Sequence, residues 1–486
     1  MKIDPSLLTI TLDRDSTTSL TRQVYQQIRR LVLTGRLTHG TRLPSTRAFG
    51  DDHGVSRTVV LNAYDQLVAE GYLNARRGSG MYVASVTVDR AGPALAKARV
   101  VQRDDNRIDL RTSHPFDLWV SAADRFPHSV WAKMLARGWR RHGASMTLKP
   151  DPKGLFALRE AIVEHVHGLR GVYCDPEQIL ITEGHSDALA LVAALMKERV
   201  PTGRIHAWVE NPGHMGACAA LRREGVRLSA IPVDAEGLQV SVGKRRSPRA
   251  KLALVTPARQ FPLGMEMSLN RRLALLAWAG QAGALVVEDD YDCDLRFAGN
   301  PLASLWSLDE TGRVAMMGSF SKAFFPGLRL GYLVASRDVA DALAAIRTRR
   351  GITLASSGQA ALAEFIGSGA LTRHLRAVRR DVRTRRHALM TQLRSTFGDD
   401  LIVQPHEVGT HVTVILGSSI DDRTTDVRIA EAAARNQLHL SPLSKQYADG
   451  TRAKQGFLLG YAGWSVQEIH KGVERMERSI GRYLQK

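Results

Sequence analysis

The sequence predicts an α/β protein in which a small helical amino-terminal domain precedes a large domain with a mostly parallel sheet. Within residues 1–84, three helical segments are followed by two short strands around a glycine-rich turn. From Ile108 onward, short apolar runs alternate with helical stretches, which is typical of parallel strands covered by helices. The 486 residues suffice for two to four domains, and a hydrophobic content of 44% is ordinary for globular cores.

The composition indicates a soluble protein with an anionic partner. No stretch approaches about 18 consecutive apolar residues, and the amino terminus lacks the apolar segment of a signal peptide, so we expect a cytoplasmic protein without a membrane span. The net charge of +19 favours a polyanion, because binding phosphates releases condensed counterions. Cys174, Cys218 and Cys293 are widely separated, which indicates neither a disulfide framework nor a metal site.

The amino-terminal elements predict a winged helix-turn-helix. Apolar spacing gives a helix from Leu20 to Leu33, Ser45 is positioned to cap a second helix, and Ser56 to cap a third that runs to about Glu70. A short strand, a basic glycine-rich turn and another strand follow, which is the pattern of a wing. The third helix would enter the major groove of DNA by its amino-terminal end. A helical hairpin used only for packing is the alternative, and the basic wing argues against it.

This segment resembles the winged-helix domain of the GntR family over about residues 15–84. The likeness rests on Gly-Arg-Leu-x-x-Gly-x-Arg-Leu-Pro-Ser-Thr-Arg (35–47) and Gly-Val-Ser-Arg-x-x-Val (54–60). It implies binding to double-stranded DNA through Arg47, Ser56, Arg57, Thr58, Arg77 and Gly78, with Arg42 and Ser45 as weaker candidates. The Gly-Ser-Gly triplet of the turn lacks the rest of any nucleotide-binding fingerprint. A linker is predicted for residues 85–107, before the large domain of residues 108–486.

Six apolar runs of the large domain are candidate strands, and polar residues follow them. The runs are residues 178–181, 206–209, 251–255, 284–287, 313–317 and 332–334. Ligands collect beyond the carboxyl ends of parallel strands, so the residues that follow the runs are candidate ligands. They include Gly184, His185 and Ser186, then His214, then Asp289 and Tyr291, and finally Ser319, Ser321 and Lys322.

Four of these polar residues have the chemistry of a pyridoxal phosphate site. Such a site needs a lysine for an imine, a carboxylate for the ring nitrogen, a donor to the phenolic oxygen and a cationic phosphate cup. Lys322, Asp289, Tyr291 and Arg329 supply these parts. Asp289 and Tyr291 are two residues apart, so both project to one face of an extended segment. The alternatives are a solvated lysine and a divalent-metal site at the acidic cluster, for which no further oxygen ligands are evident.

The large domain resembles the fold-type I aminotransferases, and in particular the MocR subgroup of GntR-family regulators. The matching motifs include Asp-Pro-x-Gly-x-x-x-Leu-Arg-Glu-Ala-Ile (151–162), Glu-Asp-Asp-Tyr-Asp (288–292) and Ser-Lys-x-x-x-Pro-x-Leu-Arg-Leu-Gly-Tyr (321–332). The resemblance implies a smaller carboxyl-terminal α+β subdomain and a homodimer with exchanged winged helices. It also implies Lys322 as the Schiff-base lysine, Asp289 as the pyridinium partner, Tyr291 as the phenolic-oxygen donor, and Ser319, Ser321 and Arg329 as the phosphate cup.

Five positions depart from the pattern of the resembled family. Ser186 replaces a glutamine, His214 stands where an aromatic ring is expected to stack on the cofactor, and Lys149 stands where a partner subunit often lends a tyrosine. Arg259 replaces a polar residue near the phenolic oxygen and is expected to add positive charge that favours an anionic ligand. Leu458 replaces an arginine that forks onto a substrate carboxylate, which argues against productive holding of an amino acid.

Three functions follow from these observations. The first is a transcriptional regulator that binds DNA and senses pyridoxal phosphate, or an amine or amino-acid effector, through Lys322. The second is a working aminotransferase with an appended DNA-binding domain, and the third is a regulator whose cofactor site has decayed. The absence of the carboxylate arginine argues against the second, and the retention of Lys322, Asp289, Tyr291 and Arg329 against the third. We therefore expect sensing rather than turnover.

Overall fold

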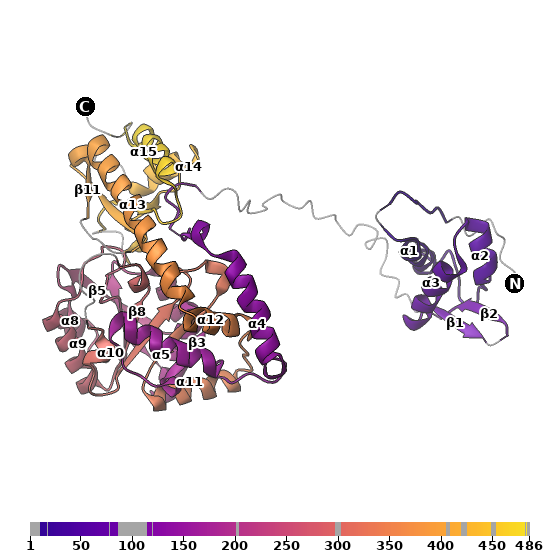
Figure 1. Ribbon diagram of the computed structural model, residues 1–486, viewed down its shortest axis with the longest axis horizontal. Helices are drawn as coiled ribbons and strands as arrows, with labels where there is room; N and C mark the ends of the chain where they lie inside the picture. The colour runs from indigo at the N-terminus through magenta and orange to yellow at the C-terminus, as the bar shows by residue number, and fades with distance from the viewer. Residues whose placement is uncertain are drawn as a thin grey trace. The chain divides into compact units, whose positions relative to one another are not determined.

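A computed structural model of the protein divides into two compact units, Met1–Asp109 and Leu110–Lys486 (Figure 1). The structure describes residues 10–16, 18–76, 78–85, 114–118, 120–200, 204–296, 303–404, 409–418, 425–448, 453–481 and 483. Arg77 and the predicted linker, apart from Ser85, lie outside these residues. None of the helices in the described ranges is long and apolar enough to cross a membrane.

The first unit is a winged helix-turn-helix, as the sequence predicts. Its elements are α1 (Leu20–Leu33), α2 (Thr46–His53), α3 (Arg57–Ala69) and the antiparallel strands β1 (Leu73–Arg76) and β2 (Gly80–Val83). Both predicted caps are confirmed, because the Ser45 hydroxyl accepts from the Ala48 N–H and the Ser56 hydroxyl from the Val59 N–H. One apolar cluster, which includes the buried Phe49, unites the helices with the wing.

An eight-stranded sheet forms the centre of the second unit, in the order β3-β10-β9-β8-β7-β4-β5-β6. The strands are β3 (Ile179–Thr182), β4 (His206–Asn211), β5 (Arg227–Asp234), β6 (Gly237–Leu238), β7 (Leu252–Val255), β8 (Leu285–Asp290), β9 (Val314–Ser319) and β10 (Gly331–Val334). The neighbours from β5 through β9 are parallel, whereas β10 is antiparallel to both β9 and β3. The β9–β10 connection is shorter than a parallel crossover requires, which explains the reversal.

Helices cover both faces of this sheet and bury its apolar side chains. One face packs against α6 (His185–Arg199), α7 (Met215–Arg223) and α11 (Arg337–Arg349). The other packs against α5 (Phe156–Arg170), α8 (Val240–Arg246), α9 (Leu269–Ala282), α10 (Leu305–Leu308) and α12 (Ser357–Gly367), and α4 (His128–Met146) packs on α12. Fully buried strands such as β7 and β10 therefore read as continuous apolar runs.

A smaller α+β subdomain follows, as the resemblance implied. Its antiparallel sheet has the order β11-β12-β14-β13. The strands are β11 (Leu401–Val403), β12 (His411–Leu416), β13 (Ser441–Pro442) and β14 (Gly456–Gly460), and the helices are α13 (Ala370–Phe397), α14 (Asp426–Ala434) and α15 (Val466–Ile480). The long helix α13 runs from this subdomain along the larger one (Figure 1).

The basic residues of α13 between 373 and 386 do not form a single exposed face. Its exposed residues are Arg373, Arg376, Arg380 and Arg383. Arg385 is buried, and its Nη2 lies 2.6 Å from Asp124 Oδ2. Arg379 donates its Nε–H to the carbonyl of Asp294 at 2.8 Å. Part of this positive charge therefore serves to join α13 to the rest of its unit.

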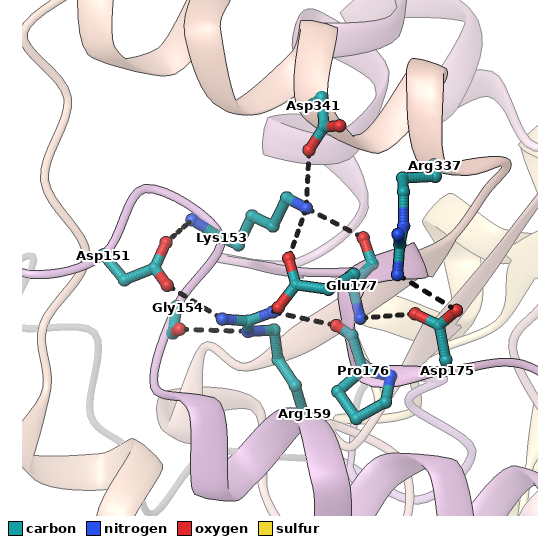
Figure 2. A network of polar contacts seen from close by, with 9 residues as sticks. All are labelled: Asp151, Lys153, Gly154, Arg159, Asp175, Pro176, Glu177, Arg337 and Asp341. Atoms are coloured by element: carbon teal, nitrogen blue, oxygen red, sulfur yellow. Dashed lines mark hydrogen bonds and ion pairs between the residues drawn. The ribbon is translucent and has the colours of Figure 1, made fainter.

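An ion-pair network anchors the Asp-Pro-x-Gly turn to the start of β3 (Figure 2). Lys153, which is almost fully buried, lies 2.8 Å from Glu177 and 2.6 Å from Asp341. Arg159 is equally buried and lies 2.8 Å from Asp151 and 3.0 Å from Glu177. These two cations lower the pKa of Glu177 to about 2. The network explains why charged residues occur in this motif although none of them lines the large cavity of this unit.

Candidate functional site

All ten residues predicted to bind the cofactor line one cavity of about 500 Å³ in the second unit. They are Gly184, His185, Ser186, His214, Asp289, Tyr291, Ser319, Ser321, Lys322 and Arg329. They come from the carboxyl ends of β3, β4, β8 and β9, as expected for a sheet of this kind. The volume falls in the range of small-molecule sites, roughly 300–1,000 Å³.

Lys322 follows β9 and presents a half-buried amine to the cavity. Its Nζ donates to the carbonyl of Leu118 at 2.9 Å. Burial lowers the pKa of Lys322 below its ordinary value, because a charged ammonium is disfavoured away from water. A lowered pKa increases the fraction of neutral amine, the form that condenses with an aldehyde.

Asp289 and Tyr291 both line the cavity, whereas Glu288 and Asp290 face the other side of β8 and contact Arg170. Asp289 Oδ1 is buried and lies 3.1 Å from His185 Nε2, but it forms no well-aligned hydrogen bond with any described group. A buried carboxylate oxygen with unused acceptor capacity fits a protonated ring nitrogen. The side-chain direction expected from the spacing of these residues is therefore observed.

The surroundings of His185 favour its protonated form. Burial lowers the pKa of His185, but the Asp289 carboxylate more than offsets this, so that the pKa lies above its ordinary value. In contrast, burial lowers the pKa of His214, which follows the carboxyl end of β4. The ring of His214 packs edge-on against Phe261 at 5.3 Å. Of these two histidines, His185 thus favours the cation and His214 the neutral ring.

Backbone and side-chain donors converge where a phosphate would lie. Gly184 precedes α6 with φ of +98°, a conformation that a glycine adopts without strain. The first N–H groups of α6 have no partner within the helix and attract anions. Arg329 has φ of +52°, a left-handed conformation that costs energy in a non-glycine residue and persists only where neighbouring structure enforces it. The Ser319 hydroxyl accepts from the Ser321 N–H at 3.2 Å, which orders this loop.

Arg259 does not add a free charge to the cavity, which corrects the sequence prediction. Its guanidinium donates to Asp292 at 2.8 Å, to Tyr291 Oη at 3.1 Å and to the carbonyl of His411 at 2.8 Å. Arg259 and Asp292 are both buried, so their charges compensate one another. Arg259 therefore orients the phenol of Tyr291 from behind.

The other positions that depart from the family pattern lie in different parts of the structure. Leu458 is fully buried on β14 in an apolar cluster with Leu118, Leu263 and Leu443, and it is not among the cavity residues. Lys149 is exposed and does not line the cavity of its own chain. Ser186 lines the cavity with the rest of the α6 amino terminus.

Sequence reasoning missed the cavity residues that come from other segments. They are Leu118, Phe261, Pro326, His411, Ser441 and Gln446, together with small and apolar residues of α6 and α7. Thr256, which directly follows the predicted run 251–255, also lines the cavity. The approach of the carboxyl-terminal subdomain, which brings His411, Ser441 and Gln446, has no local sequence signal. Among the described residues, no group of three His, Cys, Asp or Glu side chains could hold a metal ion.

Apart from Arg77, which lies outside the described residues, the predicted DNA contacts are exposed on the first unit. Arg47 on α2 and Ser56, Arg57 and Thr58 at the start of α3 are exposed, as is Gly78 in the wing. The Ser56 hydroxyl accepts from a backbone amide, so it has a structural task besides any contact with DNA. Arg42 and Ser45 are also exposed.

Comparisons with known families agree with this division. A family model described as bacterial regulatory proteins of the gntR family matches residues 20–83. A model described as aminotransferase class I and II matches residues 114–473.

Several regulators are similar over nearly their whole length. The probable rhizopine catabolism regulatory protein MocR of Rhizobium meliloti is 35% identical over 97% of this chain and 96% of its own. The pyridoxine biosynthesis regulator PdxR of Corynebacterium glutamicum is 32% identical over 96% of this chain and 98% of its own. TauR of Rhodobacter capsulatus is 32% identical over 95% of this chain and 96% of its own.

Several of the solved structures that match are aminotransferases. LysN, an α-aminoadipate aminotransferase of Thermus thermophilus crystallised with N-(5'-phosphopyridoxyl)-L-leucine, has a TM-score of 0.66 and 26% identity, and covers 76% of this chain and 92% of its own. A kynurenine aminotransferase of Pyrococcus horikoshii has a TM-score of 0.68, and the match covers 81% of this chain and 98% of its own. At 23% identity the second likeness concerns the fold alone.

Proposed function

Since this chain belongs to the MocR subgroup of GntR-family transcriptional regulators, we propose that it binds pyridoxal phosphate at Lys322 and couples that site to its DNA-binding domain. The presence of the ten predicted residues in the lining of one cavity, with a half-buried amine and a buried carboxylate, is the observation that carries the proposal. The family binds this cofactor, and members such as PdxR are named as transcriptional regulators. The bound cofactor would supply an aldehyde that reacts with amines.

Each residue has a distinct task in this proposal. Lys322 offers an amine whose lowered pKa favours the neutral form, and Asp289 accepts a hydrogen bond from a protonated ring nitrogen. Tyr291 donates a hydrogen bond to the phenolic oxygen, while Arg259 fixes the orientation of the Tyr291 side chain. Arg329, Ser319, Ser321 and the amino terminus of α6 receive the phosphate. A ligand that alters the Lys322 linkage changes contacts inside the cavity. It shifts DNA binding only to the extent that it binds one conformation of the protein better than another.

We propose a homodimer with exchanged winged helices as the DNA-binding form. Two copies of α3 would then read a repeated DNA site, direct or inverted. This assembly rests on the family resemblance.

Reduction with borohydride tests the cofactor assignment. The purified full-length protein, incubated with pyridoxal phosphate and reduced, is expected to carry one covalent cofactor per chain on the peptide that contains Lys322. Lys322→Ala should carry none, whereas Lys244→Ala, which changes an exposed lysine of α8 outside the cavity, should be labelled like the wild type. An unlabelled wild-type protein would favour the decayed-site alternative.

Aminotransferase turnover is the second candidate, because several of the matching solved structures are aminotransferases. The buried, apolar position of Leu458 argues against it, since no guanidinium replaces the carboxylate clamp there. Multiple-turnover assays with a panel of amino acids and ketoacids distinguish the two functions. Sustained ketoacid production would overturn a purely sensory role.

A further inference from the structure

Apolar side chains line the cavity next to the Lys322 amine, on which the charges of Asp292, Arg259 and Asp117 also act. Lys322 donates to the backbone of Leu118, and Leu118 belongs to the apolar cluster that contains Leu458. Phe261 packs against this cluster. An effector amine that approaches Lys322 therefore meets apolar side chains close to the reacting nitrogen.

Three side chains of the carboxyl-terminal subdomain that can form hydrogen bonds also line the cavity. Ser441 on β13 lies opposite Leu458 in the sheet register, and it lines the cavity together with Gln446 and His411. Burial, together with the nearby Arg259 guanidinium, holds the pKa of His411 well below its ordinary value. His411 thus presents a neutral ring, whose buried Nε2 has no hydrogen-bond partner among the described residues.

Cations that could hold a carboxylate are committed elsewhere. Among the described lining residues, the side chains that can carry positive charge are Lys322, Arg329 and the histidines, and the proposed function assigns Lys322 to the imine and Arg329 to the phosphate. His185 pairs with Asp289, and burial lowers the pKa of His214 and of His411 and so favours their neutral forms. Arg259 lies behind Tyr291 and is compensated by Asp292. A carboxylate brought to this end would lose water without gaining a cationic partner, which is costly in a buried site.

We propose that the effector is a primary amine whose far end is an uncharged hydrogen-bonding group such as a hydroxyl, received by Ser441, Gln446 and His411. This inference rests on the proposed function, since it requires the cofactor imine at Lys322. The effector nitrogen forms a bond to the aldehyde-derived carbon, the bond from that carbon to Lys322 Nζ breaks, and the protons of the incoming amine pass to Nζ. The exchange needs no oxidant or reductant.

Matched pairs of small amines test this preference. The pairs are ethanolamine with glycine, 3-amino-1-propanol with β-alanine, and 4-amino-1-butanol with 4-aminobutanoate. The full-length cofactor-loaded protein is titrated with each, and release of Lys322 is measured as loss of the borohydride-trapped adduct. At equal concentrations of unprotonated amine, at least one amino alcohol is expected to half-saturate at a concentration about tenfold or more below that of its amino acid.

Variants locate the preference in the structure. Ser441→Ala and Gln446→Ala should each weaken the response to the preferred amino alcohol about three- to tenfold, as expected for one lost hydrogen bond, and leave the amino-acid response unchanged. Leu458→Arg should narrow or reverse the preference. Ser395→Ala, on the exposed surface of α13, is the matched control and should change neither.

The outcomes separate this inference from the function on which it rests. Equal or tighter binding of every amino acid overturns the inference, and so does an imine that none of the amines displaces, which would leave the cofactor itself as the sensed ligand. If no imine forms before any amine is added, the proposed function fails and the inference fails with it.

Discussion

Asp289 is the residue whose charge the proposed site needs most. Its carboxylate is buried, its Oδ1 has unused acceptor capacity, and it also raises the pKa of His185. A buried carboxylate in this position is stabilised when a protonated nitrogen meets it. Two predictions at the scale of single residues follow from this arrangement.

Replacement of Asp289 by asparagine should weaken cofactor binding about 10- to 100-fold, because hydrogen bonds to a charged group contribute about 1.5–3 kcal/mol. Equilibrium titration of the Asp289→Asn protein with pyridoxal phosphate measures the change. Asp234→Asn, at the end of β5 outside the cavity, is the control and should bind as the wild type does. Unchanged affinity in Asp289→Asn would mean that the ring nitrogen lies elsewhere.

The His185–Asp289 pair predicts a pH dependence of stability in the cofactor-free protein. Folding raises the pKa of His185, so the stabilisation is complete below the unfolded pKa of about 6.5 and is lost as pH rises through the folded value. Lys322 and His214 also face this histidine, and the Lys322 charge opposes its protonation. Chemical unfolding from pH 5.5 to 8.5 should show this loss in the wild type. In His185→Gln the loss should be smaller, and parallel profiles would contradict the pairing.

At the scale of elements, the turn before α5 depends on ion pairs with carboxylates from other segments of the chain. Lys153 and Arg159 are buried side chains, and both pair with Glu177 at the start of β3. The network joins segments that are distant in the sequence, because Asp341 on α11 is the second partner of Lys153 (Figure 2). Its contribution is therefore to the docking of α5 and α11 on the sheet.

Glu177→Gln should lower the free energy of unfolding by about 1–2 kcal/mol. The value lies below that for a fully buried pair because Glu177 is partly exposed and both cations keep a second carboxylate. Denaturant unfolding measures it. Asp175→Asn, which changes an exposed pair with Arg337 at 3.5 Å, should alter stability by less than about 0.5 kcal/mol. Equal effects of the two substitutions would contradict the assignment.

The start of α3 predicts a separation of DNA binding from cofactor binding. Arg57 is exposed and is not required by the apolar cluster of its unit, so Arg57→Ala should fold normally. Loss of one base or phosphate contact should weaken specific DNA binding by about 1–3 kcal/mol. Fluorescence anisotropy on a DNA site selected from a random pool measures this, and borohydride labelling of Lys322 should be unchanged. Wild-type DNA affinity in Arg57→Ala would show that α3 is not the reading helix.

At the scale of the whole molecule, local patterns predicted the elements better than their assembly. The helix Leu20–Leu33, the serine caps of α2 and α3 and six strands of the large sheet followed from periodicity and capping chemistry. Strand β5 was missed because it is only half-buried and contains Pro232, so it lacks a continuous apolar run. The antiparallel direction of β10 depends on a loop length rather than on its composition.

For the candidate site, too, some features could be predicted from the sequence and others could not. Residues at strand ends, such as Lys322 and Asp289, could be predicted because the chain direction of a parallel sheet fixes where they gather. The compensation of Arg259 by Asp292 could not, since it depends on side-chain directions 33 residues apart. The part of the cavity formed by β12 and β13 depends on how the subdomains pack.

The central claim is that chemistry at Lys322 changes DNA binding. The most direct test measures the affinity of the full-length protein for its selected DNA site, first without and then with saturating pyridoxal phosphate and the preferred amine. The account predicts that these ligands shift the affinity of the wild type by about fivefold or more, as expected for a coupling free energy of at least 1 kcal/mol, and leave Lys322→Ala unshifted. An equal shift in Lys322→Ala, or no shift in a wild-type protein whose Lys322 is shown to carry the cofactor, would contradict it.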